Sequence, residues 1–285
     1  MKRYKIGFAL GVFDMFNITH LNFLRIAKQQ SETLIVGVIS DDLLRSLNRP
    51  NPIINETDRL SIVESIRYVD SAVLLCDDDF LNAIQMNKAD ALFAESSSFF
   101  YDKQNILFKQ VPLFGCSIEF IDNSNITDTS TSNIFNDYHI DKEDNKVLGY
   151  TTGVFDMFHI GHLNVIKRAK AHCDCLIVGV STDENVISYK HKKPVIPYEE
   201  RATIVRAVRY VDYVVPQKNM DKFAAWQLLH FNEMYHGDDW KGSKMFDEIE
   251  EKLKSVGCHT VYLPHTDGIS STLLKQKIDE LKLID

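Results

Sequence analysis

The chain has 285 residues, of which 45% are hydrophobic and 25% charged, and its formal net charge at pH 7 is −8. This length suffices for one or two domains with full hydrophobic cores, and the composition argues against a disordered chain. The acidic balance argues against a general nucleic-acid-binding surface. The sequence contains no apolar run of membrane-spanning length and does not begin like a signal peptide, so we expect a cytoplasmic protein with no membrane partner.

Two parts of the chain carry nearly the same sequence. Residues 11–16 recur letter for letter as residues 153–158. The same register aligns, without a gap, His20 with His162, Gly37 with Gly179, Asp41 with Asp183, Pro52 with Pro194, Arg59 with Arg201 and residues 67–70 with residues 209–212. Such a repeat indicates two copies of one domain. We predict domains at residues 1–137 and 146–285, joined by the polar segment 138–145.

Short apolar segments alternate with helical patterns in each copy. Residues 33–39 and 175–180 are β-branched runs without clean polar alternation, which is typical of strands covered on both faces. Residues 59–68 and 201–210 have the spacing of amphipathic helices. The alternation predicts an α/β fold with a parallel, Rossmann-like sheet in each copy. In such sheets, ligands bind at the carboxyl ends of the strands.

The second copy contains a motif that we call the histidine turn, residues 153–162 (Gly-Val-Phe-Asp-Met-Phe-His-Ile-Gly-His). It lies between a predicted strand at 146–152 and a predicted helix at 163–170. His159 and His162 lie on one face of the first helical turn, where free backbone N–H groups favour an anion. Gly161 leaves room for a phosphate to approach the backbone. The histidine turn therefore predicts a site for the phosphates of a nucleoside triphosphate.

The first copy has lost much of this chemistry. Three differences separate the copies: Asn17 replaces His159, Thr19 replaces Gly161, and residues 48–51 (Asn-Arg-Pro-Asn) replace the basic residues 190–193 (Lys-His-Lys-Lys). We therefore expect that the first copy does not catalyse. The alternative is a second enzyme with a different chemistry, because Asn17 and His20 can still hold a ligand.

The four letters His-Ile-Gly-His also occur at the active site of class I aminoacyl-tRNA synthetases. A synthetase requires a second, lysine-rich signature, for which residues 241–245 (Lys-Gly-Ser-Lys-Met) are only a faint match. No segment reads as an anticodon-binding region, and the net charge is acidic. We therefore set the synthetase interpretation aside.

Several further segments of the second half resemble the cytidylyltransferases. These are Lys190 and Lys192, Tyr198 with Arg201, residues 209–212 (Arg-Tyr-Val-Asp), residues 237–240 (Gly-Asp-Asp-Trp) and residues 268–271 (Gly-Ile-Ser-Ser). The resemblance extends from Lys146 to Ile278. It is closest to the cytidylyltransferases of glycerol 3-phosphate, with those of phosphoethanolamine and phosphocholine further off. The tandem arrangement also resembles the phosphoethanolamine enzymes.

The resemblance implies transfer of CMP from CTP to a phosphorylated small alcohol, glycerol 3-phosphate above all, with Mg²⁺ held mainly by the CTP phosphates and no metal ligands from the protein. It implies that four side chains act on phosphates: His159, His162, Lys190 and Lys192. It places the nucleotide near Gly153, Val154, Phe155, Asp156, Gly161, Arg201, Asp238, Trp240, His265, Thr266, Gly268, Ile269, Ser270 and Ser271. A solvated charge run is the alternative for the lysines, and plain packing is the alternative for Trp240.

Three positions depart from the pattern of the cytidylyltransferases. His265 stands where they carry an arginine and is a weaker, pH-dependent cation. Val154 replaces a threonine. In the acceptor region, residues 220–223 read Met-Asp-Lys-Phe where an aromatic residue and a lysine are expected, and Lys222 can substitute for that lysine. The acceptor therefore stays open among glycerol 3-phosphate, phosphoethanolamine and other polyol phosphates.

Two other functions stay open. An adenylyltransferase shares the His-x-Gly-His turn, and a non-catalytic nucleotide sensor is compatible with the degenerate first copy. The Arg-Tyr-Val-Asp segment fits cytidylyl transfer better, and the intact histidines, lysines and serines of the second copy favour an enzyme over a sensor.

The Arg-Tyr-Val-Asp segment carries a further expectation. In the cytidylyltransferases that the chain resembles, it lies at a homodimer interface, and the first copy preserves it in full as residues 67–70. We therefore expect the two halves to form an internal pseudo-dimer, with Arg67 and Arg209 near carboxylates such as Asp70 and Asp212, so that the chain can act as a monomer. The alternative is that the segment only caps a helix within each copy.

Overall fold

The computed structural model describes residues 2–76, 80–95, 109–122, 146–238, 241–242 and 244–281 of the chain. The chain divides into two compact units, and their boundary falls between residues 128 and 129. This boundary and the expected linker at 138–145 lie outside the described residues, so the exact domain limits remain a prediction. Among the described residues, no helix has the length and the apolar character needed to cross a membrane.

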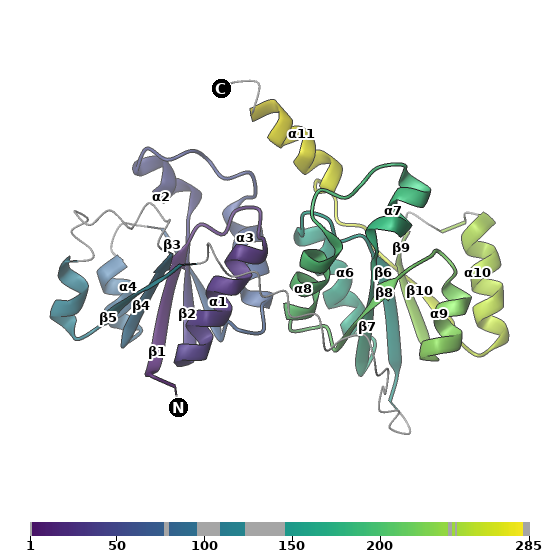
Figure 1. Cartoon of the computed structure of the whole chain (residues 1–285), viewed down its shortest axis with the longest axis horizontal. Helices are drawn as coiled ribbons and strands as arrows, with labels where there is room; N and C mark the ends of the chain where they lie inside the picture. The colour runs from purple at the N-terminus through teal and green to yellow at the C-terminus, as the bar shows by residue number, and fades with distance from the viewer. Residues whose placement is uncertain are drawn as a thin grey trace. The chain divides into compact units, whose positions relative to one another are not determined.

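The first unit is built around a five-stranded parallel sheet with the strand order β3-β2-β1-β4-β5 (Figure 1). Its described elements are β1 (Tyr4–Gly11), α1 (Ile18–Gln30), β2 (Ser31–Ile39), α2 (Asp41–Ser46), α3 (Glu56–Ser65), β3 (Ser71–Leu75), α4 (Phe80–Met86), β4 (Ala91–Glu95), the 3₁₀-helix η2 (Val111–Phe114) and β5 (Ser117–Ile121). The first strand is therefore the central one.

The second unit repeats this order around the sheet β10-β9-β6-β7-β8. Its described elements are β6 (Leu148–Gly153), α6 (Ile160–Lys170), β7 (Cys175–Ser181), α7 (Asp183–Lys190), α8 (Tyr198–Ala207), β8 (Tyr213–Gln217), α9 (Lys222–Leu229), β9 (Glu233–Gly237), α10 (Lys244–Ser255), β10 (His259–Leu263) and α11 (Ser271–Leu281). Read from β8, the strand order matches that of the first unit. The predicted pair of Rossmann-like α/β domains is confirmed.

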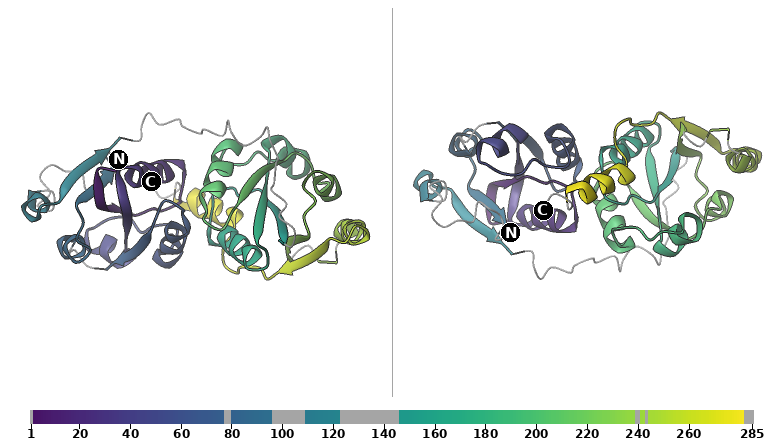
Figure 2. Two further views of the ribbon diagram at one scale, coloured as in Figure 1. Left: turned by 90° about the horizontal axis from the view of Figure 1, so that it is seen from below. Right: turned by 90° about the horizontal axis from the view of Figure 1, so that it is seen from above.

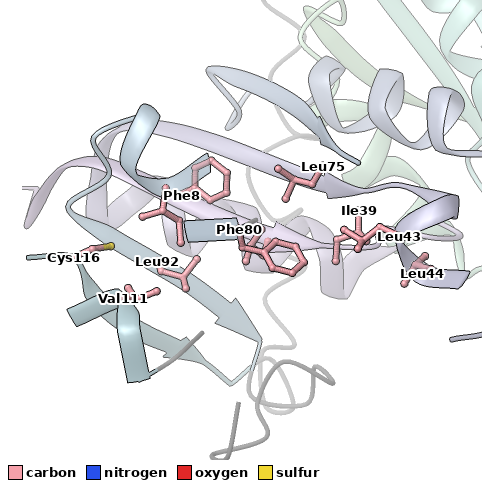
Figure 3. Close-up of a cluster of buried hydrophobic side chains, with 11 residues drawn as sticks. Phe8, Ile39, Leu43, Leu44, Leu75, Phe80, Leu92, Val111 and Cys116 are labelled. Carbon is pink, nitrogen blue, oxygen red and sulfur yellow. The ribbon is translucent and has the colours of Figure 1, made fainter. Parts of the chain in front are cut away.

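Helices cover both faces of each sheet (Figure 2). In the first unit, Phe8 and Leu92 of the sheet belong to a core with Phe80 of α4 (Figure 3). In the second unit, the ring of Tyr150 stacks on Phe231, with centroids 4.6 Å apart, in the core that the sheet forms with α9 and α10. Burial of these apolar side chains stabilises one face of each sheet and leaves the carboxyl edge for polar groups.

The helices α3 and α8 begin and end earlier than the predicted ranges 59–68 and 201–210. Each ends before the Arg-Tyr-Val-Asp segment, because Ile66 and Val208 take an extended backbone with ψ angles of 130° and 126°. The helical spacing of the sequence continued past this point, but the segment leads into β3 or β8 instead.

The aspartate of the Arg-Tyr-Val-Asp segment has the same local role in both units. Asp70 accepts the backbone N–H of Leu34 over 2.6 Å and pairs with Lys28 at 2.5 Å. Its counterpart Asp212 accepts the N–H of Leu176 over 2.7 Å and pairs with Lys170 at 2.6 Å. These contacts lie within each unit, so the segment has a structural role there without any contact between the units. The alternative, that the segment acts only within its own copy, therefore stays open. The expected pseudo-dimer stays a prediction.

Candidate functional site

The histidine turn connects β6 to α6 at the middle of the carboxyl edge. Because β6 lies between β7 and β9, this is the point where the strand order reverses, and open α/β sheets bind ligands there. Phe155 and Met157 take positive φ angles of 55° and 47°, as do Phe13 and Met15 in the first unit. Residues with side chains rarely adopt this conformation. Both units therefore build the same tight loop.

The two histidines of the turn are bonded to the start of α6. His159 is the N-cap residue, and its Nδ1 accepts the N–H of Gly161 over 3.1 Å. Nδ1 of His162 accepts the N–H of His159 over 3.4 Å. The two imidazole rings stack with their centroids 3.8 Å apart. The histidines thus occupy backbone donors that a helix otherwise leaves unpaired.

Both histidines are neutral at physiological pH. Burial, helped by the nearby His265, lowers the pKa of His159 to about 4. Burial lowers the pKa of His162 well below its usual value, and the neighbouring His159 and Lys190 lower it further. The imidazoles can therefore donate or accept hydrogen bonds, whereas positive charge at the site must come from elsewhere.

Aromatic rings surround His162. Its ring centroid lies 5.2 Å from that of Phe155 and 5.7 Å from that of Phe158. In the first unit, Phe13 and Phe16 lie 5.6 and 5.7 Å from His20, and burial lowers the pKa of His20 to about 4. The first unit has kept the two aromatic rings around this histidine, although Asn17 and Thr19 replace the counterparts of His159 and Gly161.

Gly161 is required by the ring of His159. A Cβ atom at residue 161 would lie 2.9 Å from Cε1 of that ring and 3.4 Å from Cγ2 of Ile269. The first unit carries Thr19 at this position, where the shorter Asn17 replaces the histidine and accepts the N–H of Thr19 over 2.9 Å. The two replacements are therefore physically linked. The expectation that Gly161 admits a phosphate remains untested.

The serine segment lies against the histidine turn. Ser270 caps α11 by accepting the N–H of Leu273 over 3.2 Å. The Oγ of Ser271 donates to the carbonyl oxygen of Asp156 over 2.7 Å and lies 3.5 Å from Nε2 of His159. The structure thus brings the N-termini of α6 and α11 together, and the positive ends of the two helix dipoles favour an anion there.

The loop before α11 is tied to α6 and β9. Thr266 Oγ1 accepts from Asn164 Nδ2 over 3.1 Å, and the guanidinium of Arg168 donates to the carbonyl of Pro264. The backbone N–H of His265 donates to Asp238 Oδ1 over 3.2 Å. Gly268 has a φ of 78°, which favours glycine. Three predicted residues, His265, Thr266 and Gly268, therefore lie in one loop, which a fourth, Asp238, helps to hold in place.

Asp156 and Arg201 hold the histidine turn in place. Asp156 accepts the N–H groups of Val195 and Ile196 over 2.8 and 2.9 Å. Arg201 is fully buried and donates to the carbonyls of Ile196 and Val154 and to Asp183. The counterparts in the first unit make the same contacts. Asp14 accepts the N–H groups of Ile53 and Ile54. Arg59 donates to the carbonyls of Ile54 and Val12 and to Asp41. Their bonds are structural, and direct contact with a nucleotide stays a prediction.

The two predicted lysines are exposed. Lys190 ends α7, and its Nζ lies 5.7 Å from the ring centroid of Tyr189. Its charge contributes to lowering the pKa of His162 in the histidine turn. Lys192 lies in the exposed loop that follows α7. The action of Lys190 and Lys192 on phosphates stays a prediction, and the alternative of a solvated charge stays open for both.

Two basic residues are buried at the start of α9 and the end of β9: Lys222, which the sequence suggested as a substitute for the expected lysine of the acceptor region, and His236. Lys222, at the start of α9, is only 1% exposed, and its Nζ has no hydrogen-bond partner among the described residues. Burial lowers the pKa of Lys222 to about 7. His236, at the end of β9, has a pKa lowered to about 3 by burial and by the charge of Lys222. Trp240 lies outside the described residues.

Comparisons with known proteins give one consistent family. A family model described as cytidylyltransferase-like matches residues 8–136 and 150–277. Glycerol-3-phosphate cytidylyltransferase of Bacillus subtilis is 40% identical over 134 residues, which cover 47% of this chain and 96% of that protein. Ethanolamine-phosphate cytidylyltransferase of Dictyostelium discoideum is 26% identical over 332 aligned positions, covering 96% of this chain and 90% of that protein.

Proposed function

The chain belongs to the cytidylyltransferase-like family, and from this membership we propose that its second unit transfers CMP from CTP to glycerol 3-phosphate, giving CDP-glycerol and pyrophosphate. The observation that carries the proposal is the meeting of two helix N-termini at the histidine turn, where His159 caps α6 and Ser271 of α11 lies 3.5 Å from its ring. Such termini bind phosphate groups through their free N–H groups.

The reaction needs no covalent intermediate with the protein. An oxygen of the acceptor phosphate attacks the α-phosphorus of CTP in line, the new P–O bond forms, and the bond to the departing pyrophosphate breaks. The chain then has to position the two substrates and stabilise charge on the phosphoryl oxygens. His162 serves as a neutral hydrogen-bond donor because burial keeps its imidazole uncharged. Lys190 and Lys192 supply the positive charge.

Mg²⁺ enters this proposal as part of the substrate. In the described ranges, no group of three or more His, Cys, Asp or Glu side chains is arranged to hold a metal ion. The triphosphate oxygens of CTP are themselves hard ligands that suit Mg²⁺. The ion bound there would neutralise part of the triphosphate charge, while the chain's own lysines act on the remainder.

The acceptor has a second candidate. The glycerol-3-phosphate enzyme of B. subtilis supports glycerol 3-phosphate through its 40% identity, although it aligns with 47% of this chain. The D. discoideum enzyme supports phosphoethanolamine because its similarity extends over 96% of this chain. Both acceptors present the same phosphate dianion, so the difference rests on the groups that contact the rest of the alcohol.

A substrate panel tests the proposal. The purified chain is mixed with Mg²⁺, with CTP or ATP, and with glycerol 3-phosphate, its 2-phosphate isomer, phosphoethanolamine or a larger polyol phosphate, and pyrophosphate release is measured. We expect release with CTP and glycerol 3-phosphate. Preference for phosphoethanolamine would replace the acceptor, preference for ATP would indicate an adenylyltransferase, and nucleotide binding without release under any condition would indicate a sensor.

A further inference from the structure

We propose that Ser271 is a positioning residue that holds the imidazole of His159 in the tautomer protonated on Nε2. Through this bond, the start of α11 sets the orientation of a ring in the histidine turn. The effect on turnover rests on the proposed function, whereas the tautomer itself does not.

The hydrogen bonds of the Ser271 hydroxyl determine where its single proton lies. Its Oγ is 2.7 Å from the carbonyl oxygen of Asp156, and a carbonyl oxygen can only accept. The hydroxyl proton is therefore used in that bond. Towards Nε2 of His159, which is 3.5 Å away, Oγ can only accept, so the proton of this contact must come from the imidazole.

The other nitrogen of His159 agrees with this assignment. Nδ1 accepts the backbone N–H of Gly161 over 3.1 Å, so Nδ1 carries no proton. The ring is neutral, because burial lowers its pKa to about 4. A neutral imidazole has one proton, and both neighbours place it on Nε2.

Neighbouring groups restrict movement of the His159 ring. It stacks on His162 at a centroid distance of 3.8 Å. A Cβ placed on Gly161 would approach both the ring, at 2.9 Å, and the Ile269 methyl group, at 3.4 Å. The segment that carries Ser271 therefore borders the same small space as the ring, and a shift of this segment is felt at His159.

The two histidines then have different roles. Nδ1 of His162 accepts the N–H of His159 over 3.4 Å, so the proton of its neutral ring also lies on Nε2. In the part of the chain that the structure describes, no protein group bonds to that Nε2. His162 is therefore the ring that is free to donate to a phosphate, while His159 is oriented by Ser271 and supports it by stacking.

The tautomer is measured directly in the free protein. In ¹⁵N-histidine-labelled protein near pH 7, two-bond ¹H–¹⁵N spectra distinguish the two neutral tautomers, and His159→Asn assigns its signals. We expect the Nε2–H pattern for His159 in the wild type, a partial shift towards the Nδ1–H pattern in Ser271→Ala, where only the Gly161 N–H still favours the original tautomer, and the wild-type pattern again in Ser271→Thr, which keeps the hydroxyl. An unchanged pattern in Ser271→Ala would overturn the proposal.

Kinetics separate positioning from direct phosphate binding. We expect Ser271→Ala to lower kcat by about tenfold, the size of one lost hydrogen bond, with little change in the KM for CTP, and Ser271→Thr to recover it. In a His159→Asn background, Ser271→Ala should have no further effect. Additive losses, or a loss confined to the KM for CTP, would contradict the proposal. If no nucleotide is turned over at all, the proposed function fails while the tautomer spectra still decide the role of Ser271.

Discussion

At the scale of the residue, His162 and His20 form a matched pair. Each is half-buried with two phenylalanine rings close to its own, and desolvation lowers the pKa of each. We expect His162→Ala to lower turnover by on the order of a hundredfold or more, because the donor acts on charge that develops in the transition state.

His20→Ala is the control for this variant. It removes a ring from an equivalent aromatic environment, so it should cost a similar amount of stability and leave kcat nearly unchanged. The measurements are steady-state pyrophosphate release and the thermal unfolding of both variants. If His20→Ala were as inactive as His162→Ala while still folded, the assignment of catalysis to the second unit would be wrong.

The glycine of the turn gives a second residue-scale prediction. In Gly161→Ala, the new Cβ would meet the His159 ring at 2.9 Å, a distance that requires the ring or the helix start to move. We expect the variant to remain folded but to lose activity by about tenfold or more, since misplacement of a reacting group by about 1 Å can cost about a hundredfold. Activity equal to that of the wild type would show that the turn tolerates this displacement.

Thr19→Ala is the matched change in the first unit. Thr19 is the counterpart of Gly161, and its neighbour Asn17 is the counterpart of His159. Because this change removes atoms and affects a unit without the histidine ring, it should leave activity unchanged. Crystal structures of the two variants would show whether only the ring of His159 has moved.

The sequence identified His159, Gly161 and His162 because their types and spacing lie within one helical turn. The resemblance placed Ser271 at the same nucleotide, but it did not reveal the bonds that Ser271 makes to this turn, because the two segments are 112 positions apart and the bonds depend on the packing of α11. The sequence also could not assign the tautomer, which depends on bonds to the backbone of Gly161 and to a distant hydroxyl.

At the scale of the element, the repeat itself held information on Asp156 and Arg201. Their counterparts Asp14 and Arg59 persist in the copy that has lost the other motifs. The structure explains this persistence, since each pair ties the loop after the first strand to the start of a helix. Residues that the first copy retains therefore include those that hold the turn in place, whereas residues that it has lost are candidates for contact with the substrate.

The start of α9 gives a prediction of pH-dependent stability. The pKa of Lys222 is lowered to about 7 by burial, against an ordinary value of 10.5. Between these values the unfolded chain binds more protons than the folded one at this group, so this group makes the protein more stable as the pH rises from about 7 towards 10.5. The charge of Asp221 opposes this shift, and the charge of Lys222 in turn lowers the pKa of His236.

Lys222→Met removes this dependence while filling a similar volume. Subtracting the variant's free energy of unfolding from that of the wild type at each pH should give a difference that increases with pH by at most about 1.4 kcal/mol per unit. Urea unfolding at several pH values measures it. We expect the variant to be the more stable protein near pH 7, and a pH-independent difference would show that Lys222 keeps its charge in the fold.

At the scale of the whole molecule, the repeat allowed the duplicated α/β fold to be predicted because the strand and helix patterns occur twice in one register. The helix ends at Ser65 and Ala207 were missed, since a helical spacing continues through residues that take an extended backbone.

The arrangement of the two units depends on surface contacts that periodicity does not encode, so the predicted pseudo-dimer needs its own test. Cross-linking of cysteines introduced by Tyr68→Cys and Tyr210→Cys provides that test, and absence of a cross-link would count against the pseudo-dimer.

The two units also serve as internal controls for each other when nucleotide binds. Hydrogen exchange measured by mass spectrometry with and without Mg²⁺ and CTP reports on both copies in one sample. We expect CTP to slow exchange in residues 153–164 and 266–275, where the helix N-termini of α6 and α11 meet, because bound phosphates engage those N–H groups. The counterpart residues 11–22 should exchange at an unchanged rate, since the first unit lacks the counterparts of His159 and of the basic residues 190–193. Equal protection of both segments would mean that the first unit binds nucleotide too, and would make the chain a protein with two nucleotide sites.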